Sequence, residues 1–198
     1  MAERTSGSEA ETVPGDRPPA PGGLELVQAF LNTSGNRLQG EQDRLDTPEE
    51  AVSWLTSHRL LDPGSTVSEQ GCERLQAFRE AVRSLVQAKP GSPIDAEILR
   101  LLNDAGDGGL RVIVDTRGRL SLEPIAWGVD GAMVQLLGLC HDAWLDGTWT
   151  RLKGCRRCGR AFYDRSKNRS GSWCSMSTCG NRTKNRTYRL RRSAGMST

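Results

Sequence analysis

The 198-residue sequence predicts a mainly α-helical fold, in which a helical domain with one small β-hairpin precedes a small C-terminal unit that ends in a basic helix. Apolar residues recur mostly at intervals of three and four, which is the spacing of amphipathic helices. The charge is also divided, with a balance of −10 over residues 1–150 and +13 over the rest of the chain. The expected units are a disordered leader (1–23), the helical domain (24–150), the cysteine-containing unit with its basic helix (151–192) and a tail (193–198).

The leader, residues 1–23, is rich in proline and glycine and has few apolar residues. Such a segment cannot bury enough apolar area to offset its chain entropy, so we expect it to be disordered. It lacks the apolar stretch of a signal peptide, and no run of about eighteen apolar residues occurs that could span a membrane. We therefore expect a cytoplasmic protein with reduced cysteines, in which metal binding is favoured over disulfides.

The first helix is expected to begin near residue 24, followed by a loop over residues 32–46. A second helix should start at Thr47-Pro48-Glu49-Glu50, because the threonine can cap it, the proline suits the first helical position and Glu50 completes a capping box. The apolar residues that place these two helices are Leu24, Val27, Phe30, Leu31, Ala51, Val52, Trp54 and Leu55.

The longest helix is predicted over about residues 67–88, where Thr66 and Glu69 have the spacing of a second capping box. Another helix is expected to open at Ser92-Pro93 and to close near residues 105–106. Both show apolar positions at helical spacing, so each should turn one face to a core. These positions are Cys72, Leu75, Phe78, Val82, Leu85, Ile94, Ile98, Leu101 and Leu102.

The period of the pattern changes at residues 110–114, where alternate residues are apolar. A turn-like stretch at residues 115–118 and a short apolar segment at 120–122 follow, so a β-hairpin is predicted. Helical spacing returns over residues 129–144, and Gly147 ends the helix. This helix is apolar over more than half of its surface, which predicts a central position in the domain.

Four of the six cysteines have the spacing of a zinc site. Cys155 and Cys158 form a C-x2-C motif, and Cys174 and Cys179 form a C-x4-C motif after fifteen intervening residues. A structural Zn²⁺ takes four tetrahedral thiolate or imidazole ligands, and the region contains no histidine. The sequence therefore predicts one zinc on four cysteines in a treble-clef-like finger, in which Gly159 permits a tight turn. Two disulfides, or four unrelated thiols, are the alternatives.

Two stretches of the C-terminal unit carry a family resemblance. Residues 173–182 contain Cys179-Gly180-Asn181-Arg182, and residues 164–170 follow the pattern D-x-S-x-N-R-S. Both resemble the bacterial CGNR zinc-finger family, and the upstream region is similar to the ABATE domain of that family. The resemblance covers about residues 24–192 and implies a stress-induced transcription regulator, with a DNA-binding finger beside a helical domain. The ABATE-like residues are 30–33, 47–50 and Trp54-Leu55.

The C-terminal unit is also predicted to bind nucleic acid. Residues 178–192 contain good helix formers and no proline, and the metal would hold the start of this helix through Cys179. The candidate contacts are Arg165, Lys167, Arg169, Arg182, Lys184, Arg186, Arg189 and Arg191. Arg182 is alternatively a partner for Asp164, the only acidic residue of the unit. The competing interpretation is a solvated helix that keeps the chain soluble or docks on the acidic body.

The predicted function is that of a DNA-binding regulator at the nucleoid, whose helical domain senses a small-molecule or protein signal or forms a homodimer through an exposed apolar stripe. DNA is favoured over RNA because exposed aromatic residues are few; an RNA-binding or ribosome-associated module is the alternative. A helical enzyme is the weakest hypothesis, since His58 and His141 are the only histidines and no catalytic pattern surrounds them. Cys72 and Cys140 are expected to be core residues.

Overall fold

The computed structural model describes residues 17–36, 40–89 and 91–183. The candidate contacts Lys184, Arg186, Arg189 and Arg191, and the tail, lie outside these residues. The helices of the helical domain are α1 (Leu24–Leu31), α2 (Pro48–Ser57), α3 (Glu69–Gln87), α4 (Ala96–Gly106) and α5 (Gly128–Leu145). The strands are β1 (Leu110–Val114), β2 (Leu120–Pro124), β3 (Leu152–Gly154) and β4 (Ala161–Tyr163). Together with a four-cysteine cluster near the C-terminus, these elements confirm the predicted fold class.

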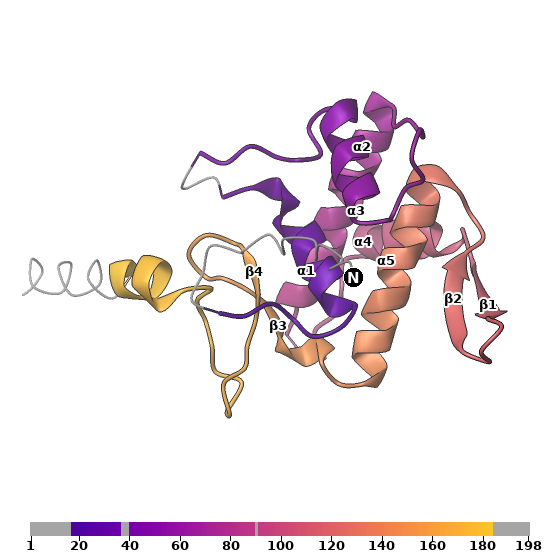
Figure 1. Ribbon diagram of the computed structural model, residues 1–198. Helices are drawn as coiled ribbons and strands as arrows, with labels where there is room; N and C mark the ends of the chain where they lie inside the picture. Colours follow the sequence, from indigo (N-terminus) through magenta and orange to yellow (C-terminus); the bar gives the residue numbers. More distant parts are fainter. Residues whose placement is uncertain (1–16, 37–39, 90, 184–198) are drawn as a thin grey trace, which may run out of the picture.

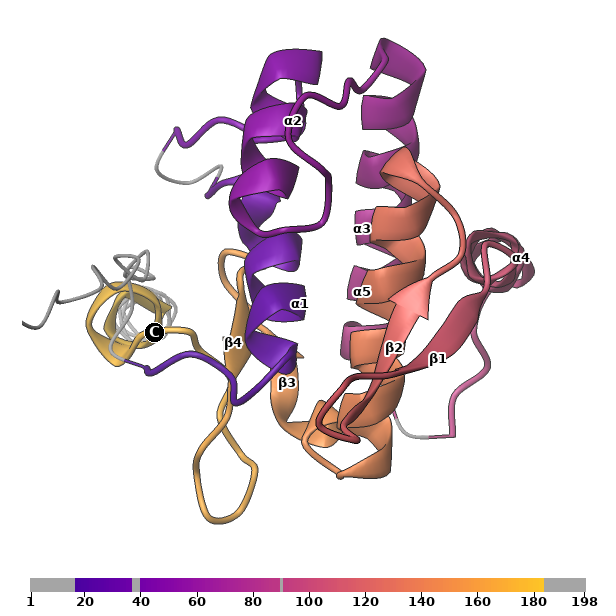
Figure 2. The ribbon, with the colours of Figure 1, turned by 45° about the vertical axis from the view of Figure 1, so that its right-hand side comes forward.

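The core lies between α1, α3 and α5, which stand side by side (Figure 2). Phe30 of α1 packs against Trp54 of α2 and Phe78 of α3, with 5.8 Å between ring centroids in each pair. Helix α5 contacts α1, α3, α4 and the β1–β2 hairpin, so it has the central position predicted for residues 129–144. None of the helices in the described part of the chain is both long and apolar enough to cross a membrane.

The residues that cap the N-termini of the helices can be compared with the predicted caps. Thr47 caps α2 as expected, since its hydroxyl accepts a hydrogen bond from the Glu50 amide. Helix α3 begins later than predicted, because the Ser68 side chain, and not that of Thr66, accepts the amide of the first turn. Similarly, Asp95 caps α4 in place of the expected start at Ser92-Pro93. Serine and aspartate are equivalent caps, so several candidates in one loop cannot be ranked from sequence.

The predicted hairpin is confirmed as an antiparallel pair, β1 and β2, in which Leu110 lies opposite Pro124 and Val114 opposite Leu120. Strand β2 extends two residues beyond the predicted end at residue 122. The turn is held by Asp115, whose carboxylate accepts hydrogen bonds from the amides of Arg117 and Arg119. The hairpin and the C-terminal unit lie on opposite sides of the helical domain (Figure 1).

Residues 17–23, the described part of the predicted leader, make specific contacts with the rest of the chain; residues 1–16 lie outside the described part, so the disordered leader stays a prediction. Ala20 is buried, and its amide donates a hydrogen bond of 2.8 Å to the Gln28 side chain. The carbonyl of Pro19 accepts a hydrogen bond of 3.0 Å from Arg165. Residues 17–23 have no core of their own, but they contact α1 and the C-terminal unit. The prediction from composition considered only the residues of the segment itself and could not include these contacts.

The C-terminal unit shares the core of the helical domain. Leu152, Ala161 and Tyr163, from the β3–β4 hairpin, belong to the same buried apolar cluster as α1 and α3. Asn32, just after α1, makes two hydrogen bonds to the backbone of Ala161: its amide nitrogen donates to the carbonyl at 3.0 Å, and its oxygen accepts the amide at 2.8 Å. Arg83 of α3 also donates to the Gly159 carbonyl at 3.0 Å. The hairpin therefore folds against the helices.

The Asn32 contact can be tested by stability measurements. Asn32→Ala should lower the free energy of unfolding of the zinc-loaded protein by about 1–3 kcal/mol, because both polar backbone groups of Ala161 lose their partner beside the core. The measurement is urea unfolding followed by circular dichroism. Asn103→Ala, the same change at an exposed position of α4, is the control and should cost nothing. Equal stability of both variants would show that the two hydrogen bonds do not join the units.

Candidate metal centre

The first cysteine pair lies in the connection of the β3–β4 hairpin. Cys155 follows β3, and its amide donates to the Arg160 carbonyl at 2.8 Å, which continues the hairpin ladder. The chain then turns back on itself through Gly159, whose φ of +78° is a backbone conformation that favours glycine. The amide of Gly159 donates to the Cys155 carbonyl at 2.9 Å, which closes the turn. The expected tight turn beside the C-x2-C motif is thus confirmed.

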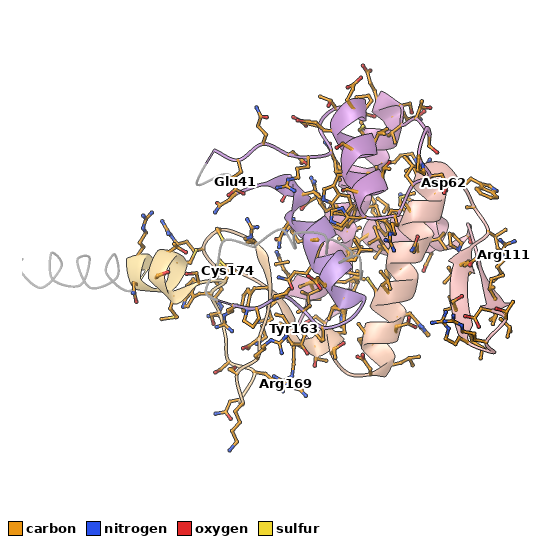
Figure 3. The ribbon with its side chains drawn as sticks, in the orientation of Figure 1. Glu41, Asp62, Arg111, Tyr163, Arg169 and Cys174 are labelled. Carbon is orange, nitrogen blue, oxygen red and sulfur yellow. The ribbon has the colours of Figure 1, made fainter. Side chains whose placement is uncertain are left out.

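The second pair lies at the start of a short helix, Met176–Gly180, whose helical conformation continues through residue 183; we call residues 176–183 the finger helix. Ser175 caps it, since its hydroxyl accepts a hydrogen bond of 3.2 Å from the Thr178 amide. Cys174 precedes this cap and Cys179 lies within the first turns. Figure 3 shows Cys174 where the chain enters the finger helix.

The four thiol sulfur atoms lie within 4.8 Å of one another. The distances are 3.6 Å between Cys158 and Cys174, 3.7 Å between Cys174 and Cys179, and 3.7 Å between Cys179 and Cys158. A tetrahedral zinc with Zn–S bonds of about 2.3 Å separates its sulfurs by about 3.8 Å. All six cysteines are free thiols, so the disulfide alternative does not describe this arrangement. The donor set and its spacing therefore fit Zn²⁺.

The cluster lies in a small core of its own. Cys155, Cys174 and Cys179 are buried, and Phe162 and Trp173 pack against them. Trp173 is half-buried and covers one side of this small core.

The close approach of the thiols also changes their ionisation. Hydrogen bonds from the thiols of Cys158 and Cys174 hold the pKa of Cys155 well below its usual range. The reciprocal bond to Cys155 raises the pKa of Cys158 to about 11. Zinc takes its ligands as thiolates, so its binding would release the protons of the thiols that are still protonated.

A second organising group of the finger is the buried carboxylate of Asp164, which is 0% exposed. One oxygen accepts from the Ser166 amide at 3.1 Å and lies 3.2 Å from the Arg17 guanidinium. The other accepts from Lys153 at 2.8 Å and from the Gly171 amide at 2.7 Å. Burial opposes ionisation, but the hydrogen bonds from Lys153 and Ser166 outweigh it and hold the pKa of Asp164 well below its usual range. A Cβ at Gly171 would lie 2.6 Å from this carboxylate.

The expected pairing of Asp164 with Arg182 is therefore wrong, because Lys153 and Arg17 occupy that role. Lys153 is brought beside Asp164 by the antiparallel pairing of β3 with β4. Arg17 comes from the segment expected to be disordered, and its guanidinium also lies 4.9 Å from the centroid of the Phe162 ring. Arg182 is exposed on the finger helix, and its side chain has no hydrogen bond or ion pair with another described residue.

The other basic residues fall into two groups. Arg165 lies over the Tyr163 ring at 5.4 Å and donates to the Pro19 carbonyl; Arg169 donates to the Thr150 hydroxyl at 2.9 Å. Figure 3 shows Arg169 on the loop after β4, which lies below the finger helix in this view. Lys167 is exposed and, within residues 17–36, 40–89 and 91–183, its ammonium has no partner. The same holds for Arg182.

Arg156 is a candidate contact that the sequence reasoning missed. It lies between Cys155 and Cys158, is exposed, and has a guanidinium with no hydrogen bond or ion pair in the described part of the chain. A signal for it was present: both cysteines of a C-x2-C turn point to one metal, so a residue between them is directed outwards. The neighbouring Arg157 is held to the finger helix, since it donates to the Thr178 carbonyl at 2.7 Å.

This fold and site define a helical protein that carries a treble-clef-like, four-cysteine zinc finger. The family model ABATE, described as "Putative stress-induced transcription regulator", matches residues 24–146, and the model of the CGNR zinc finger matches residues 151–192. The chain belongs to the ABATE family and carries a CGNR zinc finger with one structural zinc. Neither model describes an enzyme. No curated protein shows a significant match to the chain.

Proposed function

We propose that this protein is a DNA-binding transcription regulator, and not an enzyme, that acts in the cytoplasm at the nucleoid. In this proposal Cys155, Cys158, Cys174 and Cys179 hold one structural zinc, which fixes the start of the basic helix, and this helix binds duplex DNA. The observation that carries the proposal is the position of Cys179 in the finger helix. A helix anchored by a metal at its beginning is rigid enough to enter a major groove.

The free basic side chains of the finger are the proposed contacts with DNA. Arg156, Lys167 and Arg182 are exposed and have no side-chain partner within the described residues. The sequence continues with Lys184, Arg186, Arg189 and Arg191, which remain proposed contacts. Arg165 and Arg169 are held by contacts within the protein, so we assign them to positioning the loop, from which they can still approach phosphate.

The charge of the finger sets the strength of binding and its response to salt. Each neutralised phosphate contributes about −0.9 to the slope of log affinity against log salt concentration, so six to eight contacts predict a slope of about −5 to −7. An uncharged recognition surface would show little dependence. The acidic helical domain, with the balance of −10 over residues 1–150, disfavours contact of that side with DNA.

Removing two of the free cations tests the proposed surface. The double substitution Lys167→Ala with Arg182→Ala should weaken binding to duplex DNA about tenfold or more and reduce the salt slope by about two, because two phosphate contacts are lost. The measurement is fluorescence anisotropy of a labelled duplex, titrated at several salt concentrations.

Its control is Arg117→Ala on the β1–β2 turn, which removes an exposed arginine on the other side of the molecule and should leave affinity unchanged. Equal losses in both variants would contradict the proposed surface. Tighter binding of a structured RNA than of the duplex would replace DNA by RNA as the polymer.

We assign the helical domain the role of a sensor or interaction module. An open cavity of about 380 Å³ lies beside α2 and supports a binding role. His58 lies at its edge, stacked on Trp54 with 4.2 Å between ring centroids, and its Nδ1 atom is 2.8 Å from the Trp54 carbonyl oxygen. This histidine is thus engaged in packing, and His141 is exposed on α5. The cavity is lined by Arg44, Glu49, Glu50, Ser53, Trp54, Ser57 and His58.

A further inference from the structure

One face of the β1–β2 hairpin is apolar and open to solvent. The register places Val112 opposite Leu122 and Val114 opposite Leu120, so these four side chains share a face. Their exposed fractions are 59% for Val112, 43% for Leu122, 63% for Val114 and 74% for Leu120. We call these four residues the hairpin face. The polar residues of the strands, such as Ser121, point to the other side.

The hairpin face is the continuation of a surface that packs on α5 at its base. Leu110, at the start of β1, lies so close to α5 that a Cβ at Gly138 would be 3.1 Å from its Cδ1 atom. Leu145 lies seven residues after Gly138 and therefore on the same side of the helix, and it is 71% exposed.

The area of the hairpin face suits a weak, reversible interface. At these exposed fractions the hairpin face presents on the order of 400 Å², which is within the range of the largest apolar patch of a typical monomer. Two such faces would bury at most about 800 Å² together, which is the size of a weak and transient interface and not of a stable complex.

We propose that the hairpin face is covered by the hairpin face of a second copy of this chain, packed face to face across a two-fold axis. The positions that share this face along both strands, from Leu110 to Pro124, carry no charge, so nothing on it selects a charged partner. The two valine–leucine pairs form a surface that is complementary to itself, as an isologous dimer interface requires. This dimer goes beyond the proposed function and does not depend on nucleic acid.

The remaining parts of this chain are poor candidates for covering the hairpin face. Residues 1–16 contain only Met1, Ala2, Ala10 and Val13 as apolar residues, and residues 184–198 carry five cations among fifteen residues, with Tyr188, Leu190, Ala194 and Met196 as their apolar ones. Neither segment has a set of large aliphatic side chains equal to the four that it would have to cover. The hairpin face of a second copy supplies four such side chains.

The test is the mass of the zinc-loaded full chain in solution without nucleic acid, measured by sedimentation across concentrations up to several hundred micromolar. We expect a species of twice the 21.7 kDa chain mass that dissociates on dilution. Leu120→Glu should raise the dissociation constant about a hundredfold, because it adds a negative charge to each of the two apolar faces that pack against one another. Ser121→Glu, the same charge on the other face of β2, should leave the dimer intact.

A monomer at every concentration in the unmodified chain would overturn the proposal, and so would a Leu120→Glu variant that still dimerises. Dissociation of the Ser121→Glu dimer to the same extent would overturn it as well, because the effect would then not belong to the face. Far-UV circular dichroism and the zinc content of each variant check that it is folded. The result is independent of the DNA titrations, so either proposal can fail alone.

Discussion

The variant Cys174→Ser should contain no zinc and should lose the fold of the finger, whereas the unmodified protein should hold one zinc per chain. Structural zinc sites contribute about 10–16 kcal/mol of apparent binding free energy, most of which appears as folding free energy. The finger has only a small apolar core around the cluster, formed mainly by Phe162 and Trp173. Without the metal, that core cannot offset the entropy of the loop before the finger helix.

The loss should extend into the helical domain. Leu152, Ala161 and Tyr163 belong to the core shared with α1 and α3, so an unfolded finger would expose part of it. We therefore expect a lower melting temperature for the whole protein, and not only the disappearance of a small C-terminal transition. Elemental analysis and thermal unfolding followed by circular dichroism measure the two effects.

Cys140→Ser is the matched control, because it makes the same change in a half-buried thiol of α5 outside the cluster. It should keep one zinc per chain. Zinc that remains at full occupancy in Cys174→Ser would contradict the four-cysteine site. A folded helical domain with an unchanged melting temperature would contradict the shared core instead.

Asp164→Asn is the second change with a large expected effect, and it should destabilise the protein by about 3–5 kcal/mol. That is the usual result of removing one partner from a buried ion pair, since the other charge is left without compensation. Both carboxylate oxygens accept hydrogen bonds, from Lys153 and Gly171 on one side and from Ser166 on the other. The side-chain amide of asparagine has only one acceptor oxygen. Its NH₂ group would therefore face hydrogen-bond donors on one side of the site, where it cannot accept.

The effect should depend on pH in a defined direction. The pKa of Asp164 is lower in the folded protein than the value of about 3.9 in an unfolded chain, so folding is favoured by the ionised form. This stabilisation is complete above the unfolded pKa and is lost as the pH falls towards the folded pKa. The unmodified protein should therefore lose stability below about pH 4, and its difference from Asp164→Asn should become smaller there.

Urea unfolding between neutral and acidic pH, with zinc content recorded at each pH, measures this difference. Asp115→Asn is the control: hydrogen bonds from Arg119 also lower the pKa of Asp115, but its side chain is 34% exposed on the hairpin turn, and asparagine keeps the oxygen that accepts both turn amides. It should change stability little. A difference between Asp164→Asn and the unmodified protein that stays constant down to the acidic end would show that the charge of Asp164 is not the cause.

Local features of the fold could be predicted because local interactions produce them. The Thr47 cap, the β1–β2 turn and the alternation of its strands depend on residues within a few positions of one another. The boundaries of α3 and α4 could not be placed as well, because Ser68 and Asp95 compete with other polar residues that are equally good caps. The choice depends on how each helix packs.

The metal centre could also be predicted from residues that are close together in the sequence. Two cysteine pairs with short spacings can reach one ion, because the hairpin turn and the start of the finger helix each present two sulfurs. Which basic side chains are free to bind a partner could not be predicted from local spacings. Lys153, Arg165 and Arg169 all lie in a basic stretch of sequence, yet each is held by a partner within the protein.

The sequence by itself determined the helical class, the hairpin, the four-cysteine set and the division of charge, because each depends only on composition or on spacings of a few residues. Only the tertiary structure decided that Arg17 reaches Asp164, that Asn32 holds Ala161, and that the finger shares the helical core. Arg17 and Asp164, and Asn32 and Ala161, are more than a hundred residues apart in the chain. Their contacts depend on how whole helices and strands pack, and this packing cannot be predicted from local sequence patterns.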